Sequence, residues 1–415
     1  TASPEEEGLD PELLQVASDY ALRDGFFTQS ILVIKNGKLV HERYRGITTE
    51  EANLVAEYSD LDKEEAVGMF SPRDELSLST SFSVAKSFTS ILIGIAVDRG
   101  YIESIDDLAS YYINEWVDDD RASITIRNLL DMRSGLVLGC YDSITGGVVT
   151  CGSEGVSHGG SIIFATNQLD GCINRVQAES GISHPWYRFG VYDIGDWVYS
   201  NCDTMVLGEI LNRAVGTNFR DWAEEALFSK LGFQGEIWRD NSGLELEEGN
   251  YLSYCCFDAT ARDFAKFGQL ILNNGRWNNQ QIVSEDYIEE IKNIALISNV
   301  AELNSNFSYG LQFWTITPFL QLEGEEYPPA NSIYSAIGYD GQYIAIDFEN
   351  QLVLVRFSLY HPLLSLGSGR RMKIVLGDLD ATNYPLTIPN SLGAETGESF
   401  LLARFAYLVD NAIEL

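Results

Sequence analysis

The stretch SFSVAKSFTSILIGIAVDRG, residues 81–100, puts Ser83 and Lys86 three positions apart at the start of a predicted helix. Apolar residues follow at near-helical spacing, and Arg99-Gly100 supplies a basic last turn and a glycine stop. On such a helix the serine and the lysine lie on one face, one turn apart. The positive end of the helix suits an oxyanion at Ser83, and a lysine in an apolar pocket can lose its proton near neutral pH and activate the hydroxyl.

An ordinary helix is the alternative interpretation of the same motif. In that case Ser83 caps the helix and Lys86 is a solvated charge in its first turn. The spacing also arises by chance in a serine-rich chain, so the choice depends on the other motifs in the sequence.

Composition limits the partners of the chain. Its 415 residues, 45% of them hydrophobic, are enough for one large core or two interleaved cores. A net charge of −34 excludes nucleic acid and anionic membranes as default partners. No apolar run reaches the roughly 18 residues that span a bilayer. We expect a small-molecule substrate, no nucleic acid and no membrane span, with the oligomeric state left open.

The cysteines indicate an oxidising compartment. Their number is even, and they are Cys140, Cys151, Cys172, Cys202, Cys255 and Cys256. A disulfide between Cys140 and Cys151 is a hypothesis. We expect a periplasmic or secreted protein whose signal peptide has been removed. Because there is no C-x-x-C pair and the four histidines are scattered, we expect no metal and no cofactor.

The pattern along the chain separates strands from helices. Helical periodicity covers residues 11–23, 83–99, 199–215, 260–273 and 400–413, with short helices at 102–108 and 124–130. Alternating β-rich runs predict two hairpins, at residues 30–44 and 343–357. Residues 47–79 are acidic and irregular, and residues 137–185 read as a long loop of the kind that is usually functional.

Strands therefore cluster at both ends of the chain and helices in the middle. One sheet built from both ends, with a helical lobe inserted, follows from that order. We expect residues 1–80 and 245–415 to form a sheet domain and residues 81–244 a helical domain that contains the 137–185 loop, with the active site between them.

Three further stretches accompany the Ser83 motif: WVYSNCDT at 197–204, ARDFAKFG at 261–268 and AIGYDGQ at 336–342. Their order and wording resemble the serine β-lactamase-like family, which includes class C β-lactamases, penicillin-binding proteins, family VIII esterases and 6-aminohexanoate-dimer hydrolase. The resemblance spans roughly residues 10–410, and the last two groups look most similar. It implies an α/β (α+β) fold of the β-lactamase/transpeptidase type: a central antiparallel sheet flanked by helices, plus an inserted all-α lobe.

The resemblance also implies roles for individual residues. Ser83 matches the nucleophile of the family and Lys86 its base. Tyr199 matches the tyrosine that shares protons with the lysine and protonates the leaving group. Asn201 matches the amide that orients the lysine or the substrate. A serine hydrolase acting on a small ester or amide through an acyl-enzyme is the implied activity.

The last motif supplies the substrate side of the site by the same resemblance. The oxyanion hole would be the backbone N–H groups of Ser83 and Tyr339. Ala336, Ile337 and Gly338 stand where relatives have Lys-Thr-Gly or His-x-Gly. Since Ala336 offers no cation for a substrate carboxylate, β-lactamase or D,D-peptidase activity is doubtful. An esterase or amidase for neutral or cationic substrates fits better.

Several alternatives stay open. Asp170 or Asp193 is a candidate partner for a substrate amine, although a surface charge is the favoured interpretation of each. Tyr112-Ile113-Asn114 repeats the Tyr-x-Asn pattern but lies soon after the serine. The G-x-S-x-G around Ser157 would indicate an α/β-hydrolase, yet it lacks the preceding strand and following helix. A non-catalytic or slow acyl-binding module of the same fold is the alternative outside enzymes.

Overall fold

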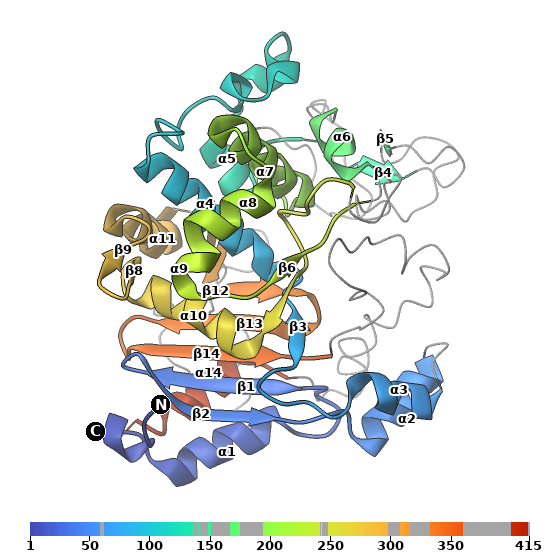
Figure 1. Cartoon of the computed structure of the whole chain (residues 1–415), viewed down its shortest axis with the longest axis vertical. Coiled ribbons are helices and arrows are strands. Elements are labelled where there is room, and N and C mark those ends of the chain that lie inside the picture. The colour runs from blue at the N-terminus through green and yellow to red at the C-terminus, as the bar shows by residue number, and fades with distance from the viewer. Residues whose placement is uncertain are drawn as a thin grey trace.

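A computed structural model describes residues 1–58, 62–136, 139–141, 148–150, 167–174, 194–240, 242, 248–297, 308–315, 333–359 and 400–413. Within these residues an antiparallel sheet lies in the lower half of the molecule as drawn, and a lobe of helices stands above it (Figure 1). The predicted combination of one sheet with an inserted helical lobe is confirmed. No helix in these ranges is long and apolar enough to cross a membrane.

The main sheet joins the two ends of the chain. Its seven strands are ordered β10-β11-β12-β13-β14-β1-β2. Their bounds are Ser30–Lys35 (β1), Lys38–Tyr44 (β2), Ser308–Gly310 (β10), Phe313–Thr315 (β11), Ile333–Gly338 (β12), Gln342–Asp347 (β13) and Leu352–Phe357 (β14). Ser30 pairs with Phe357 and Lys35 with Leu352, so β1 lies between β14 and β2. Both predicted hairpins are confirmed.

Two helices cover one face of this sheet. They are α1 (Pro11–Ala21) and α14 (Leu402–Asp410), and they contact each other. Asp10 caps α1 by accepting hydrogen bonds from the N–H groups of Glu12 and Leu13, and Pro11 fills its first position. The apolar side of α1 packs with the outward side chains of β1 and β14 in a separate core cluster.

The opposite face carries α10 (Ala261–Leu272) and the central helix α4 (Val84–Asp98). Helix α10 lies directly on β13 and β14, because a Cβ added at Gly268 would sit 2.5 Å from Val353 and 2.8 Å from Ile344. Helix α4 contacts β12 on the sheet side and α7 (Asn201–Val215) on the lobe side. The largest core cluster runs through α4 from the sheet into the lobe. The predicted domain division therefore stays a prediction.

The lobe around α4 is built from the long helix α7 and several short elements. They are η2 (Ala109–Tyr111), η3 (Asn114–Trp116), η4 (Asp120–Ser123), α5 (Ile126–Leu130), α6 (Gln168–Ile173), α7, α8 (Phe219–Ala223), the π-turn Glu224–Phe228 and α9 (Ser229–Leu231). Helix α7 ends at Gly216, whose φ of 79° is left-handed, as the sequence predicted.

The remaining elements lie around the sheet and the lobe. They are η1 (Glu5–Glu7), β3 (Leu78–Thr80), β4 (Gly139–Tyr141), β5 (Val148–Thr150), β6 (Glu236–Ile237), β7 (Phe257–Thr260), β8 (Arg276–Trp277), β9 (Gln280–Gln281), α11 (Glu285–Ile297) and η7 (Tyr339–Gly341). Strands β3, β7 and β6 form a small sheet, and β3 leads directly into the turn before Ser83.

Three local predictions are wrong. The range 137–185, expected to be one long loop, contains the short strands β4 and β5 and the helix α6. The acidic segment 47–79 contains α2 (Thr49–Tyr58) and α3 (Lys63–Phe70), whose few apolar side chains pack in a small cluster with Phe27 and Leu359. Residues 102–108 form turns instead of a helix. There the N–H of Asp106 donates to Ser104 Oγ and the N–H of Ser104 to Asp107, both at 3.1 Å, and such local bonds compete with a helix.

Candidate active site

Ser83 and Lys86 meet at the start of α4. Lys86 Nζ lies 2.9 Å from Ser83 Oγ. Ser83 occupies the N-cap position with φ −67° and ψ −5°, but its side chain makes no capping hydrogen bond. Lys86 is only 1% exposed. The structure thus contradicts the ordinary-helix interpretation, in which the serine caps the helix and the lysine is solvated.

The surroundings of Lys86 favour a neutral amine. Burial lowers the pKa of Lys86 well below its usual value. Its Nζ donates to the carbonyl oxygen of Tyr254 at 3.0 Å, and it lies 5.0 Å from the ring centre of Tyr199 and 5.1 Å from that of Tyr254. A neutral amine held this way keeps a lone pair for the hydroxyl proton of Ser83.

The turn before Ser83 is held from the side of β7. The N–H of Ser81 donates to the carbonyl of Phe257 at 2.8 Å, and the N–H of Phe257 returns a bond to Ser81 Oγ at 2.8 Å. The N–H of Cys256 donates to the carbonyl of Phe82 at 3.2 Å. Phe82 itself has a φ of 44°, which a side-chain-bearing residue rarely adopts. These bonds fix the backbone on which the serine is presented.

Tyr199 lies against the same lysine, at the start of α7. Ser200 caps α7 by accepting the N–H of Asp203 at 3.2 Å, so the helix begins immediately after Tyr199. The ring of Tyr199 stacks on that of Trp314 with 5.7 Å between centres and contacts Tyr309 edge-on at 6.2 Å. Tyr199 is thereby packed between Lys86 and aromatic residues of β10 and β11.

Asn201, the other half of the motif, is the first residue of α7. Its Oδ1 is buried and accepts no hydrogen bond within the described part of the chain. The competing Tyr-x-Asn lies at the opposite end of α7, where Arg213 donates to the carbonyl of Tyr112 at 3.0 Å. The structure therefore brings Tyr199 to Lys86 and sets Tyr112 apart from it.

The end of β12 reaches the turn that carries Ser83. A Cβ added at Gly338 would lie 2.3 Å from the carbonyl oxygen of Ser81. Tyr339 follows at once, 48% exposed, with its ring 6.1 Å from that of Phe82. Ala336 is 0% exposed, its side chain being part of the core, and Ile337 is half-buried. This strand presents no cation at position 336.

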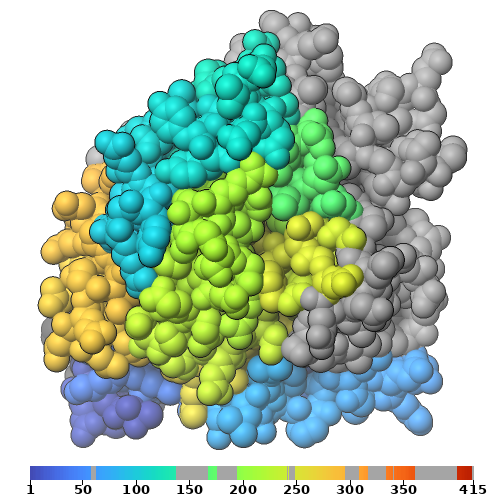
Figure 2. Space-filling model, turned by 45° about the horizontal axis from the view of Figure 1, so that its top comes forward, coloured from blue at the N-terminus to red at the C-terminus, as the bar shows by residue number. Residues whose placement is uncertain are grey.

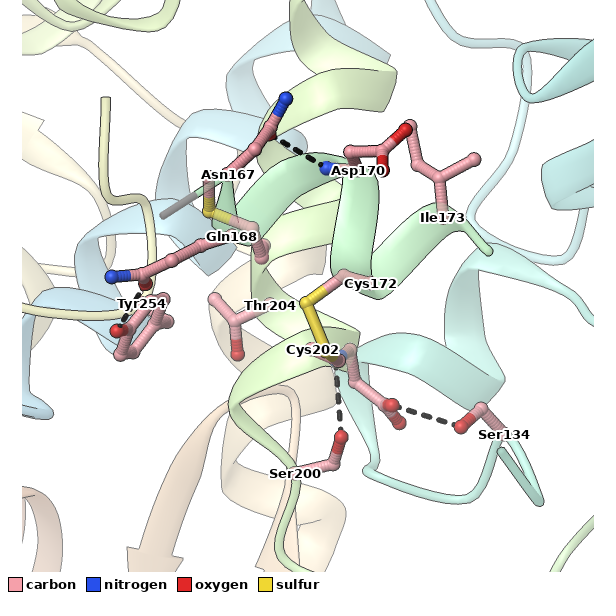
Figure 3. Close-up of a disulfide and its surroundings, with 12 residues drawn as sticks. Ser134, Asn167, Gln168, Asp170, Cys172, Ile173, Ser200, Cys202, Thr204 and Tyr254 are labelled. Atoms are coloured by element: carbon pink, nitrogen blue, oxygen red, sulfur yellow. Dashed lines mark hydrogen bonds between the residues drawn. A yellow bond between two sulfur atoms is a disulfide. The ribbon is translucent and has the colours of Figure 1, made fainter. Parts of the chain in front are cut away.

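Tyr254 and α6 form a further wall of the site, and no motif in the sequence indicates it. The hydroxyl of Tyr254 donates to Gln168 Oε1 at 2.6 Å (Figure 3). The N–H of Gln168 in turn donates to the buried carboxylate of Asp240 at 2.9 Å. A disulfide between Cys172 and Cys202 joins α6 to α7, one residue after Asn201. A second bond links the adjacent residues Cys255 and Cys256.

Some predicted residues are not part of this arrangement. Cys151, Ser157, Asp193 and most of the 137–185 loop lie outside the described residues, so the Cys140–Cys151 hypothesis stays untested. Asp170 is exposed on α6 and accepts a hydrogen bond from Asn174 at 2.9 Å. Across the described ranges, no three His, Cys, Asp or Glu side chains are grouped to hold a metal ion.

A hollow on the surface lies apart from the catalytic candidates. It has a volume of about 370 Å³ and opens where α6, α7 and residues 248–251 meet (Figure 2). Its wall includes Met205, Glu209 and Arg239, but none of Ser83, Lys86 and Tyr199.

The sequence of the chain is similar to those of known proteins. The β-lactamase family model matches residues 21–362. The chain is 24% identical over 318 residues to 6-aminohexanoate-dimer hydrolase of Paenarthrobacter ureafaciens, covering 75% of this chain and 73% of that protein.

Solved structures share the fold at low identity. A penicillin-binding protein homologue from Caulobacter crescentus matches with a TM-score of 0.59 and 14% identity, covering 92% of this chain and 98% of that one. EstCE1, a hydrolase with promiscuous acyltransferase activity, matches with a TM-score of 0.54 and 14% identity, over 92% and 97% of the two chains.

Proposed function

Because the chain belongs to the β-lactamase family and is a serine hydrolase, we propose that it cleaves a small ester or amide through an acyl-enzyme formed on Ser83. One observation carries the proposal: a fully buried lysine whose amine lies 2.9 Å from the serine hydroxyl. A nucleophile and a base within hydrogen-bond reach are what acyl transfer requires.

Acylation begins with proton transfer from Ser83 Oγ to the neutral amine of Lys86. The oxygen then attacks the substrate carbonyl carbon, and the carbonyl oxygen becomes an oxyanion. The N–H groups of Ser83 and Tyr339 bind that oxyanion, in line with the contact between Gly338 and the turn before Ser83.

Tyr199 completes the proton path. Its phenol gives a proton to the leaving alcohol or amine as the bond to the acyl carbon breaks, and it regains a proton from the Lys86 ammonium. The position of Lys86 Nζ beside Tyr199, 5.0 Å from the centre of its ring, supports this role. Water then attacks the acyl-enzyme by the same steps in reverse, releasing the acid.

A mass spectrum after brief exposure to a p-nitrophenyl ester or a fluorophosphonate tests the proposal. We expect one adduct, mapped to Ser83 by peptide digestion and lost in Lys86→Ala. Ser87→Ala is the matched control, because Ser87 lies one turn further along α4 and only donates to the carbonyl of Gln312 at 2.7 Å. An adduct on another serine, such as Ser157, would overturn the assignment.

A rate measurement separates turnover from binding. A hydrolase releases product at a steady rate after any burst, whereas an acyl-binding module stops after one equivalent. We expect steady release with p-nitrophenyl acetate.

Substrates without a carboxylate at the strand edge fit this site best. Relatives that process β-lactams hold a carboxylate with a lysine where this chain has buried Ala336. We therefore expect nitrocefin to be hydrolysed far more slowly than a p-nitrophenyl ester. Turnover of nitrocefin as fast as by a dedicated β-lactamase would contradict this substrate class.

A periplasmic or secreted location is also proposed. It is supported by the Cys172–Cys202 disulfide, since such bonds persist in oxidising compartments. Detection of the mature protein in the cell supernatant or periplasmic fraction tests it, and retention in the cytosol would contradict it.

A further inference from the structure

A buried arginine reaches the turn that carries Tyr339. Arg356 lies on β14, opposite Tyr343 of β13 and Ile31 of β1, and is 3% exposed. Its Nη1 donates to the carbonyl of Gly341 at 2.7 Å, and its Nε donates to Thr28 Oγ1 at 3.0 Å. Its Nη2 donates to the carbonyl of Phe26. One guanidinium therefore joins β14, the segment before β1 and the end of η7.

Gly341 is suited to this contact in two ways. Its φ of 80° is left-handed, and a Cβ there would lie 2.2 Å from Arg356 Nη1. Glycine thus lets the guanidinium approach the backbone directly. Next to it, Gln342 exchanges two side-chain hydrogen bonds of 3.0 Å with Ser358, which fixes the start of β13.

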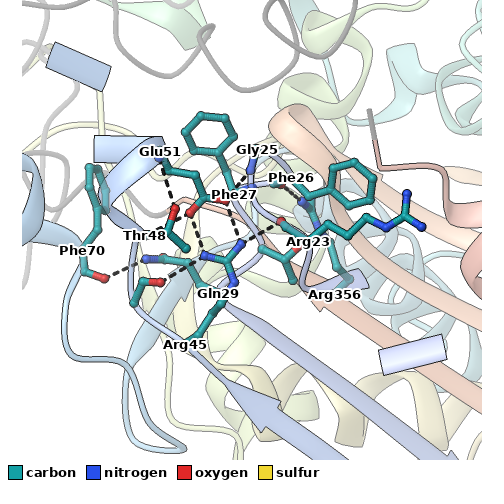
Figure 4. A network of polar contacts seen from close by, with 12 residues as sticks. Arg23, Gly25, Phe26, Phe27, Gln29, Arg45, Thr48, Glu51, Phe70 and Arg356 are labelled. Atoms are coloured by element: carbon teal, nitrogen blue, oxygen red, sulfur yellow. Dashed lines mark hydrogen bonds and ion pairs between the residues drawn. The ribbon is translucent and has the colours of Figure 1, made fainter. Parts of the chain in front are cut away.

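The other side of Arg356 is held equally firmly. Figure 4 shows the segment from Arg23 to Gln29 between the guanidinium of Arg356 and the carboxylate of Glu51. Glu51 accepts the N–H groups of Gly25 at 3.1 Å and Phe27 at 2.8 Å, while Arg45 pairs with both of its oxygens at 2.6 and 2.7 Å. The segment to which Arg356 donates is thus itself held in place by Glu51.

From this arrangement we propose that Arg356 is a positioning residue for the oxyanion hole. The inference rests on the proposed function, in which the N–H of Tyr339 binds the oxyanion. The turn 339–341 is fixed at its start by the packing of Gly338 on Ser81 and at its end by Arg356. With both ends held, the Tyr339 N–H points to one place, and a displacement of about 1 Å there weakens transition-state binding strongly.

A guanidinium performs this task better than a lysine would. A planar fork with five N–H donors reaches acceptors on three segments at once, whereas an ammonium is a point charge on a flexible stem. Burying a charged side chain costs free energy. The three hydrogen bonds that Arg356 donates to separate segments offset that cost and fix the geometry of the turn.

The test compares Arg356→Met and Arg356→Lys with Thr28→Val. Thr28→Val removes another partner of the same guanidinium but leaves the bond to Gly341. Each variant is assayed with a p-nitrophenyl ester and with its thionoester, whose sulfur is a poor hydrogen-bond acceptor. The ratio of oxoester to thionoester rates reports the oxyanion hole, which a general loss of stability does not change.

We expect Arg356→Met to lower kcat about 10- to 100-fold with KM nearly unchanged, and to lower the oxoester/thionoester ratio by a similar factor. Arg356→Lys should fall between it and the native protein, and Thr28→Val should keep the native ratio. A folded Arg356→Met protein with the native ratio would overturn the proposal. So would failure of both Arg356 variants to fold, because the residue would then be structural.

The proposed function is judged separately. If the native protein forms no adduct on Ser83, the function itself fails. If Ser83 is labelled and the ratio is unaffected in Arg356→Met, the function stands and only the role of Arg356 is lost.

Discussion

Lys86 is a basic side chain that the fold keeps away from water, and its protonation therefore links activity to stability. Its pKa is lowered in the folded protein because of burial. Between that lowered pKa and the ordinary value near 10.4, the unfolded chain binds one more proton than the folded one. The free energy of unfolding contributed by this residue accordingly rises with pH across that window.

We expect this linkage to disappear in Lys86→Met. The difference in unfolding free energy between native protein and variant should grow with pH by up to about 1.4 kcal/mol per unit between the lowered pKa of Lys86 and the ordinary lysine value. Urea denaturation at several pH values measures it. Ser83→Ala, which is also inactive but keeps the lysine, should follow the native slope. Parallel curves for native protein and Lys86→Met would show that the lysine is protonated in the fold.

The buried side chain of Asn201 leads us to expect a preference for amide over ester substrates. Its buried Oδ1 has no donor in the described part of the chain, and an amide substrate brings an N–H that an ester lacks. We expect Asn201→Leu to lower kcat/KM about 10-fold for an amide and much less for the matching ester.

Asn212→Leu is the control for that experiment. Asn212 Oδ1 is likewise buried and has no donor among the described residues, but it lies far along α7. Equal losses for amide and ester in Asn201→Leu would assign Asn201 to the lysine instead of the substrate.

At this scale the sequence reveals side chains but not backbone partners. The sequence motifs predict Ser83, Lys86 and Tyr199 as catalytic residues, and the structure brings all three together. The carbonyl of Tyr254, which accepts from Lys86, has no side-chain signature. The contact of Gln168 with Tyr254 depends on tertiary folding, so no local pattern in the sequence indicates it.

Among the elements, α6 depends most on a covalent bond. The Cys172–Cys202 disulfide closes a separation of 30 residues and holds Gln168 against Tyr254. We expect the double variant Cys172→Ser/Cys202→Ser to lose about 3 kcal/mol of stability, together with part of its esterase activity. Thermal denaturation and steady-state rates measure both effects.

Gln168→Leu is the matched variant for the disulfide, because it breaks the hydrogen bond to Tyr254 and leaves the disulfide intact. It should lower activity with a smaller loss of stability. Unchanged melting of the double serine variant would contradict a stabilising role for the bond.

The sequence predicts helices and strands correctly where apolar periodicity is strong. It does not predict helix α3, whose start depends on a capping box. The helices α1, α4, α7 and α10 follow from apolar spacing together with their end signals, and the hairpin of β1 and β2 follows from two adjacent β-rich runs. Helix α3 begins with a capping box of Asp62 and Glu65, which the sequence contains, but the acidity of the segment favours an irregular structure there.

Over the whole molecule, charge is the dominant global property. The 61 acidic and 27 basic residues leave a net charge of −34. Repulsion among the excess carboxylates destabilises the compact folded state. We expect the melting temperature to rise by ~2 °C or more between 10 and 150 mM NaCl, as the Debye length falls from about 30 to 8 Å.

KCl at the same concentrations serves as the control, because screening does not distinguish the two salts. A flat or falling melting temperature would mean that the ion pairs lost to screening outweigh the repulsion relieved.

The position of β1 between β14 and β2 also bears on the order of events on the ribosome. The hairpin of β1 and β2 leaves the exit tunnel early, yet the neighbour that covers the open edge of β1 is made among the last strands of the sheet. Until then, the apolar residues Ile31 to Ile34 present an unpaired edge to other chains. The edge of β1 therefore stays unpaired until β14 has been synthesised. A chaperone that shields this edge would govern the yield of active protein.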